Sequence, residues 1–219
     1  MDRLILHLLN FIPFLVCLTF HEFAHAYSAT KFGDPTPRSQ GRLTLNPLAH
    51  IDPIGTILVP LTMTLIGVPP FGWAKPVMVN PYNMREPAKH MMISTACGPL
   101  ANIVQGIVFA LGIRLYISLS PAILNNVWLI NWLLLFPIIA FILALFNIIP
   151  LWVLDGREVL RYFLPYNQKV VYHEFNERYG MYVLFGMIWL LPYLHVDVLN
   201  YWFRPAFWAT GFLTGLYGL

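Results

Sequence analysis

An uninterrupted apolar segment, residues 128–149, limits what this chain can fold into more than any other feature. It contains no charged residue and is followed by Pro150. At about 1.5 Å per residue in a helix, it is long enough to cross the roughly 30 Å hydrocarbon core of a bilayer. Only 11% of the 219 residues are charged and 58% are hydrophobic, whereas soluble domains carry about 25% charged residues. The sequence therefore predicts an all-α, polytopic membrane protein.

About five full transmembrane helices are expected on this basis. A shorter apolar segment, Ile54–Gly67, contains Pro60 and falls below the ~20 residues that a full span needs, so we expect a re-entrant or partial span there. The last two helices would form a C-terminal hairpin, residues 179–217. Since no small-residue cleavage site interrupts the first apolar run, we expect that run to stay in the membrane. The five expected spans are residues 4–30, 88–118, 128–149, 179–194 and 201–216.

The distribution of basic residues orients this predicted bundle. If Ile54–Gly67 does not cross, most of the thirteen Lys and Arg residues fall on the face where the first helix ends. Cytoplasmic loops carry such an excess, so we expect this face to be cytoplasmic. The same count of crossings brings Asp155 to the face that holds His21 and His25. The basic residues on this face are Lys31, Arg38, Arg42, Lys75, Arg85, Lys89, Arg157, Arg161, Lys169 and Arg178.

The segment FHEFAHAYSAT, residues 20–30, places three ionisable side chains at the end of the first predicted span. His21 and His25 are four positions apart, so on a helix both imidazoles face one side and can bind one metal ion. Glu22 lies one position round the helix, where it can reach a water on the ion rather than the ion itself. Zinc with three protein ligands and one open position suits this arrangement. A chance match is disfavoured, because idle ionisable groups are costly at membrane depth.

A third metal ligand has to come from elsewhere on the same face. Asp155 is the best candidate, because Pro150 and Gly156 interrupt the helix around it and allow its carboxylate to turn into the bundle. Spacing alone leaves open a second interpretation, in which Asp155 caps a helix that begins at Arg157. The other candidates on this face are Asp34, His50, Asp52, Glu86, His90 and Glu158.

Five segments occur in a fixed order between about Phe20 and Leu160: HEFAHAYSA, GRLTLNPLAHIDPIGT, GWAKPV-x-VNPYN, ACGPLAN and FNIIP-x-x-x-LDG. Together they resemble the site-2 protease family of intramembrane zinc metalloproteases. The resemblance is closest to the compact bacterial branch, which has no PDZ or CBS domain. It implies that residues 1–219 form a single integral membrane protease domain, with a core at residues 4–160 and the C-terminal hairpin after it.

The resemblance also implies a reaction and a site. The expected reaction is hydrolysis of a peptide bond in or near the transmembrane segment of a single-span membrane protein. One Zn²⁺ per chain would be bound by His21, His25 and Asp155, with Glu22 as the general base. The expected location is the cell (inner or plasma) membrane, with the site set within the bilayer near its cytoplasmic face.

Two asparagines match further family motifs. Asn147 matches the asparagine of N-x-x-P-x-P-x-L-D-G, which implies that it holds the substrate backbone. Asn102 matches the asparagine of G-P-x-x-N, which suggests substrate binding, although an interhelical hydrogen bond explains it equally well.

The chain departs from the family pattern near the predicted site. Trp152 stands where the motif has its second proline, Arg157 follows Asp155-Gly156 in place of a glycine, and Met78 replaces a proline. None is a predicted ligand, so the departures bear on loop geometry and substrate entry. A small edge β element at residues 75–79 could accept a peptide by strand addition, and flanking prolines would confine it to an edge.

Two other functions remain open at this stage. A membrane metal-binding or transport protein could use the same three ligands, but it would not need Glu22. A catalytically impaired homologue could act as a binding partner. No nucleic-acid partner is expected, because the net charge of +3 is small and spread along the chain. The substrate, any gating partner and the oligomeric state are not specified by the sequence.

Overall fold

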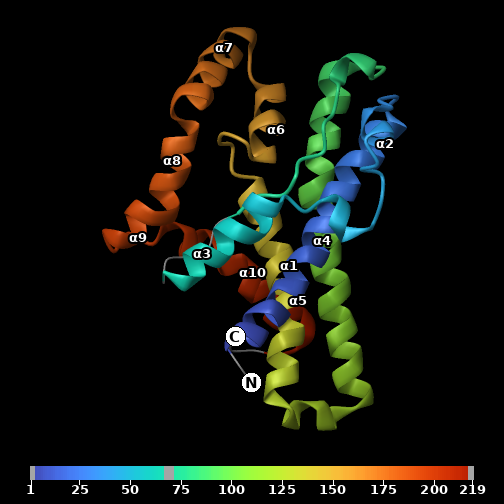
Figure 1. Ribbon diagram of the computed structural model, residues 1–219, viewed down its shortest axis with the longest axis vertical. Coiled ribbons are helices and arrows are strands. Elements are labelled where there is room, and N and C mark those ends of the chain that lie inside the picture. The colour runs from blue at the N-terminus through green and yellow to red at the C-terminus, as the bar shows by residue number, and fades with distance from the viewer. Residues whose placement is uncertain (1–2, 67–71, 217–219) are drawn as a thin grey trace.

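The computed structural model describes residues 3–66 and 72–216, and within these two stretches all regular structure is helical (Figure 1). The predicted all-α class is therefore confirmed for the described residues. Three helices contain segments long and apolar enough to cross a membrane. They are α1 (Arg3–Lys31), α4 (Pro87–Leu119) and α5 (Val127–Asn147).

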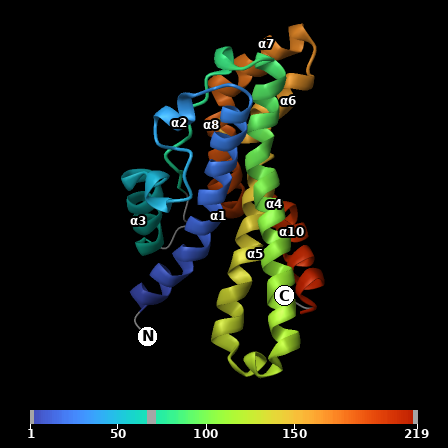
Figure 2. The ribbon, with the colours of Figure 1, turned by 90° about the vertical axis from the view of Figure 1, so that its right-hand side faces the viewer.

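Helix α4 is the central element of the bundle. It packs against α1, α5, α6 (Asp155–Phe163) and α10 (Val198–Thr214). Figure 2 shows α1, α4 and α5 side by side, with α4 and α5 joined at the end of the molecule farthest from α7. Toward that far end lies an apolar cluster of Ile113, Ile130 and Leu134. Polar side chains that are buried lie mostly at the opposite end, around α1 and the first half of α4.

The short apolar segment folds as a π-helical turn, η2 (Pro53–Leu58), that continues into α3 (Val59–Leu65). Asp52 begins this helix by accepting hydrogen bonds from the N–H groups of Ile54 and Gly55. At about 1.5 Å per residue the combined helix is only about 20 Å long, which is short of the roughly 30 Å hydrocarbon core. Its length is that of a partial span. Gly67, the last residue of the predicted segment, lies outside the described residues.

The C-terminal region differs from the predicted hairpin. The helical segments α7 (Tyr166–Phe175), η5 (Asn176–Gly180), α8 (Met181–Phe185), η6 (Gly186–Leu190) and α9 (Leu191–Tyr193) follow one another without interruption. Helix α10 leaves this arm at 93° rather than folding back along it. His195, with a φ of +59°, lies in the turn between them. Counting this bent pair as one span gives up to four spans, against the predicted five.

The predicted edge β element at residues 75–79 is not confirmed, because the structure assigns no strand to the described part of that loop. Two backbone N–H groups at the start of this loop are each held by a single hydrogen bond, and the two acceptors lie in different parts of the chain. The Trp73 N–H donates to the Gly55 carbonyl over 3.1 Å, and the Lys75 N–H donates to the His50 carbonyl over 3.0 Å. Pro76 has no N–H to offer a ladder. Residues 75–80 therefore form an irregular segment along the bundle, which we call the strap.

One end of the bundle gathers the short polar elements. Helices α2 (Thr36–Ser39), α6 and α7 lie together at the top of Figure 1, opposite the α4–α5 connection. These elements carry Arg38, Arg157, Arg161 and Lys169. These basic residues lie at the end of the bundle where α1 ends. This agrees with the topology in which Ile54–Gly67 does not cross the membrane.

Candidate metal centre

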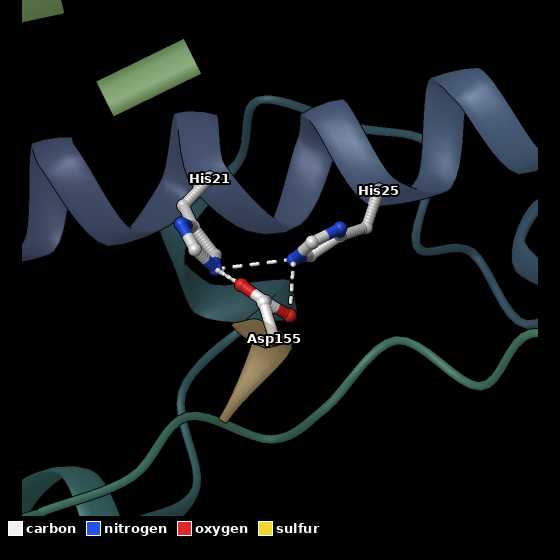
Figure 3. A group of neighbouring side chains, drawn as sticks. All are labelled: His21, His25 and Asp155. Carbon is white, nitrogen blue, oxygen red and sulfur yellow. Dashed lines mark hydrogen bonds and ion pairs between the residues drawn. The ribbon is translucent and has the colours of Figure 1, made fainter. Parts of the chain in front are cut away.

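His21, His25 and Asp155 converge in the structure, as the sequence predicts (Figure 3). The two imidazoles project from one face of α1, and the carboxylate comes from the first residue of α6. Their Nε2 atoms are 3.1 Å apart. The His21 Nε2 lies 3.2 Å from Asp155 Oδ2, and the His25 Nε2 lies 3.4 Å from Asp155 Oδ1. Two ring nitrogens and the two oxygens of one carboxylate thus surround one point.

The other nitrogen of each imidazole is bonded to α4. His25 Nδ1 lies 2.8 Å from the Ser94 carbonyl oxygen, which can only accept, so this nitrogen carries the proton. His21 Nδ1 lies 2.5 Å from Asn102 Oδ1. The Asn102 amide is oriented by its Nδ2, which donates to the Cys17 carbonyl and to Gln105 Oε1. Both neutral histidines therefore present a lone pair on Nε2.

This donor set fits a zinc ion. Two imidazole nitrogens and a carboxylate converge on one point, and an ion bound there would contact all three side chains. In a tetrahedral site with metal–ligand distances of about 2.0–2.1 Å, neighbouring ligand atoms lie ~3.3 Å apart. The two nitrogens are 3.1 Å apart and each lies 3.2 or 3.4 Å from its nearer carboxylate oxygen, all close to that value. Asp155 Oδ2 is buried and has no hydrogen-bond partner among the described residues, as expected of an atom that binds an ion.

Asp155 does not cap a helix. Leu154 is the N-cap residue of α6, and no side chain caps that helix, so the capping interpretation does not hold. Gly156 lets the start of α6 pack against the backbone at the end of α5, because a Cβ atom at this position would lie 2.1 Å from the Ile148 carbonyl oxygen. The other candidate ligands lie outside this group of three. They are Asp34, His50, Asp52, Glu86, His90 and Glu158.

Gly98 brings α4 against the histidines, a role that the sequence did not reveal. A Cβ atom at this position would lie 2.4 Å from His25 Nε2 and 2.7 Å from His21 Cε1. The small residues of ACGPLAN were a signal of close helix packing that could have been used. The Ser94 contact had no such signal, because it uses a backbone carbonyl, which every residue has.

Glu22 lies beside the metal centre and is 8% exposed. Its Oε2 accepts a hydrogen bond of 3.2 Å from the Val77 N–H of the irregular strap. This contact links the helix that bears the histidines to the loop that runs past them. The Glu22 carboxylate, next to His21 in the chain, is thus held in position by a residue that is not part of α1.

The two asparagines differ in their surroundings. Asn102 is fully buried and bonded to His21, so it contacts the metal centre through an interhelical hydrogen bond. Asn147 is half-buried at the end of α5, where its Nδ2 donates to the Leu143 carbonyl. Its predicted contact with a substrate backbone stays a prediction.

An apolar cavity of about 320 Å³ borders the metal centre on the side of α10. Asp155 and Gly156 form part of its wall. The remaining wall residues come from α4, α5, α6 and α10, and nearly all of the lining surface is apolar. Such a wall offers few polar partners to water, so it limits the hydration of the carboxylate from this direction. The other lining residues are Ala96, Pro99, Leu100, Ile103, Phe141, Ala144, Leu145, Ile148, Val159, Pro205, Ala206 and Ala209.

Comparison with known proteins identifies the class of this site. The model of peptidase family M50 matches residues 113–191. A Bacillus subtilis protein, named "Putative zinc metalloprotease YwhC", is 33% identical over 207 residues, covering 88% of this chain and 87% of that protein. A Mycobacterium tuberculosis protein of the same described class, Rip2, is 28% identical over 194 residues, covering 86% of this chain and 67% of that protein. No solved structure gives a significant match.

The chain therefore belongs to peptidase family M50, the site-2 protease family, and the resemblance seen in the sequence motifs is confirmed. It is a multi-pass membrane protein and an intramembrane zinc metalloprotease, with Zn²⁺ as its cofactor.

Proposed function

We propose that this protein is an endopeptidase in which His21, His25 and Asp155 bind one Zn²⁺ per chain and Glu22 is the general base. The observation that carries the proposal is the convergence of two Nε2 lone pairs and one carboxylate, separated by 3.1–3.4 Å. The Nδ1 atoms of both histidines are bonded to α4. Both Nε2 atoms therefore already face the point where an ion would bind.

Glu22 supplies the proton transfers of peptide hydrolysis. Zinc in such a site polarises the substrate carbonyl and activates a water. As the water oxygen bonds to the carbonyl carbon, a Glu22 carboxylate oxygen takes its proton. The same proton then passes to the amide nitrogen as the carbon–nitrogen bond breaks. The Val77 N–H holds Glu22 Oε2, so it fixes the carboxylate for both transfers.

The irregular strap provides a surface for the substrate backbone. It passes Glu22 at Val77, and it is fixed at both ends, through the Lys75 N–H to His50 and through the Asn80 N–H to Asp34. An extended peptide laid along it would place a carbonyl near the metal centre. Because a hydrogen-bonded helix hides its carbonyls, the substrate is a single-span segment that unwinds locally. Asn147, at the end of α5, would hold the substrate backbone beside it.

Asn102 supports the site rather than the substrate in this proposal. It fixes the tautomer of His21, and such outer partners raise the basicity of a metal-bound imidazole. Residues 1–219 act as one protease domain with its core at residues 4–160. The end that carries α2, α6 and α7 faces the cytoplasm from the cell membrane, because cytoplasmic loops hold the excess of Lys and Arg.

A paired measurement tests this proposal: bound zinc per chain, and cleavage of a panel of single-span model substrates, for the wild type and Glu22→Gln. We expect both proteins to hold zinc and the variant to lose at least about 100-fold in cleavage. Zinc in both without cleavage by either would favour a metal-binding protein or an impaired homologue that acts as a partner. Absence of zinc from both would overturn the ligand set.

A further inference from the structure

The loop that leads to Asp155 contains an unusual backbone conformation. Trp152 has a φ of +39°, in the region that residues other than glycine rarely adopt and that persists only when surrounding contacts impose it. Trp152 is three residues before Asp155. Whatever holds Trp152 in this conformation also fixes the start of α6, and with it the direction of the carboxylate.

Side chains from α7 and η5 hold this loop by its backbone. The Trp152 N–H donates to Asn176 Oδ1 over 2.6 Å, and the Tyr172 hydroxyl donates to the Pro150 carbonyl over 2.7 Å. Asn176 is completely buried, and its Nδ2 donates to the Tyr172 carbonyl over 3.1 Å. That second bond turns the amide so that its oxygen faces the Trp152 N–H. The loop is therefore anchored at two successive points to the C-terminal arm.

Arg157 ties the other side of Asp155 to the same arm. Its Nη1 donates to the Trp152 carbonyl over 3.2 Å, so both polar groups of the Trp152 backbone are bonded. Its Nη2 donates to Glu177 Oε1 over 2.6 Å and lies 3.0 Å from His173 Nδ1. The guanidinium thus joins the loop, α6 and η5. Trp152 and Arg157, the two departures from the family motif around Asp155, therefore contact each other, and each is bonded to a side chain of η5.

The arm is shaped to make these contacts. Asn176 and Gly180 bound the π-helical segment η5, and such segments change which side chains face a neighbour. Gly180 lets the helix approach the loop, since a Cβ atom there would lie 3.1 Å from both the nitrogen and the Cβ of Trp152. The Trp152 ring in turn packs edge-on against Phe185 of α8.

We infer that Arg157, Tyr172, Asn176 and Glu177 form a clasp that positions Asp155 for zinc binding. The inference rests on the proposed role of Asp155 as a zinc ligand. The clasp residues do not bind the ion; they fix the loop on one side while Gly156 packs against the Ile148 carbonyl on the other. The C-terminal arm is therefore part of the metal centre rather than only a membrane anchor.

The test measures zinc affinity rather than cleavage. Full-length protein is purified in detergent, and its zinc dissociation constant is found by competition with a chromophoric chelator. The visible absorption of the Co²⁺-loaded protein reports ligand geometry. Asn176→Ala should weaken zinc binding by up to about 10-fold, at the low end of the loss for a direct outer partner because Asn176 does not bond to Asp155 itself, and should alter the Co²⁺ spectrum. Tyr172→Phe and Glu177→Gln should each have a smaller effect in the same direction.

The matched control is Glu174→Gln on α7. Glu174 is exposed, and the described residues show no bond from it to the loop. It should keep wild-type affinity and the wild-type Co²⁺ spectrum. If Asn176→Ala does not fold, the double variant Tyr172→Phe/Glu177→Gln replaces it, since neither change empties a buried position.

Unchanged zinc affinity and an unchanged Co²⁺ spectrum in folded variants would overturn the clasp, even if the metal-free protein melts at a lower temperature. That outcome would show a role in stability alone. A wild-type protein that binds no zinc would instead contradict the ligand set of the proposed function, so the two failures are distinguishable.

Discussion

The two sides of the metal centre are built in different ways. His21 and His25 share one helix, so their spacing is set by helix geometry and their orientation by two bonds to α4. Asp155 comes from a loop and the first turn of a short helix, and contacts more than fifteen positions further along the chain hold that loop. The spacing of the two histidines is thus set by local helix structure, whereas the position of Asp155 depends on the folded C-terminal arm.

This difference also appears in accessibility. The side chains of His21 and His25 are 6% and 12% exposed, whereas that of Asp155 is 16% exposed. The histidine side is closed by the packing of α1 on α4, while the aspartate side borders a cavity. We therefore expect substitutions on the histidine side to have the larger effects on zinc binding, because little room exists there for relaxation.

The largest effect is expected from Gly98→Ala. The added methyl would lie 2.4 Å from His25 Nε2 and 2.7 Å from His21 Cε1, so either the imidazoles turn away or α4 moves out. Zinc affinity should fall by more than ~100-fold, beyond the loss typical of one outer partner. Chelator competition measures this loss.

The control for this prediction is Gly112→Ala on the same helix, where a Cβ atom meets nothing within 4 Å. It should keep zinc affinity and stabilise the protein by roughly 0.5–1 kcal/mol, because alanine favours a helix interior over glycine. Equal zinc affinity in both variants would show that α4 does not constrain the histidines.

Asn102→Ala should weaken zinc binding by about 10–100-fold. The variant removes the acceptor that keeps the proton of His21 on Nδ1. Gln105→Leu is the matched control, because Gln105 bonds to Asn102 and not to the histidine, and its buried Nε2 has no partner. Zinc affinity should be nearly unchanged in this control. A larger loss in Gln105→Leu than in Asn102→Ala would contradict the orienting role of Asn102.

The same comparison explains what the sequence could predict. The spacing of His21 and His25 is readable because one helix turn determines it. Asp155 could be placed on the right face by counting crossings, and its role was implied by the motif around it. The clasp was not predictable, because it depends on where the arm that carries Asn176 packs.

The fold shows the same division. Hydropathy located the three helices that are long and apolar enough to cross a membrane. It also predicted a C-terminal hairpin of two further spans, but apolarity does not reveal that the arm ending in α9 and helix α10 meet at 93°. The loop sequence also suggested an edge strand at residues 75–79, where the N–H groups of Lys75 and Val77 instead donate to single groups of His50 and Glu22.

Val77→Pro should lower cleavage by roughly 10- to 100-fold while zinc affinity stays unchanged. The substitution removes the N–H that holds Glu22 Oε2, and a hydrogen bond to a charged group contributes about 1.5–3 kcal/mol. Met78→Pro is the control, since the described residues provide no acceptor for the Met78 N–H. It should cleave at close to the wild-type rate. Unchanged cleavage in Val77→Pro would show that the strap does not position the base.

Asp34 is a second buried carboxylate and sharpens the comparison with Asp155. Protein donors surround it: the N–H and hydroxyl of Thr36, the N–H of Asn80 and the side-chain amide of Asn83. Burial raises the pKa of Asp34, but these hydrogen bonds outweigh that effect and hold its pKa below the ordinary value. A carboxylate satisfied in this way needs no metal ion.

The smallest effect is therefore expected from Asp34→Asn, which should cost about 1–3 kcal/mol of stability without changing zinc affinity. The side-chain nitrogen of the new asparagine would face an N–H or O–H group that now donates to Asp34, so two donors would oppose each other and one hydrogen bond would be lost. Because the folded pKa is lowered, the stabilisation is present above the unfolded value of about 3.9 and is lost as the pH falls through the folded value. Thermal unfolding in detergent from pH 7 to pH 3 should show the gap between wild type and variant closing at the acid end. A gap independent of pH would mean that the ionised carboxylate does not hold the strap.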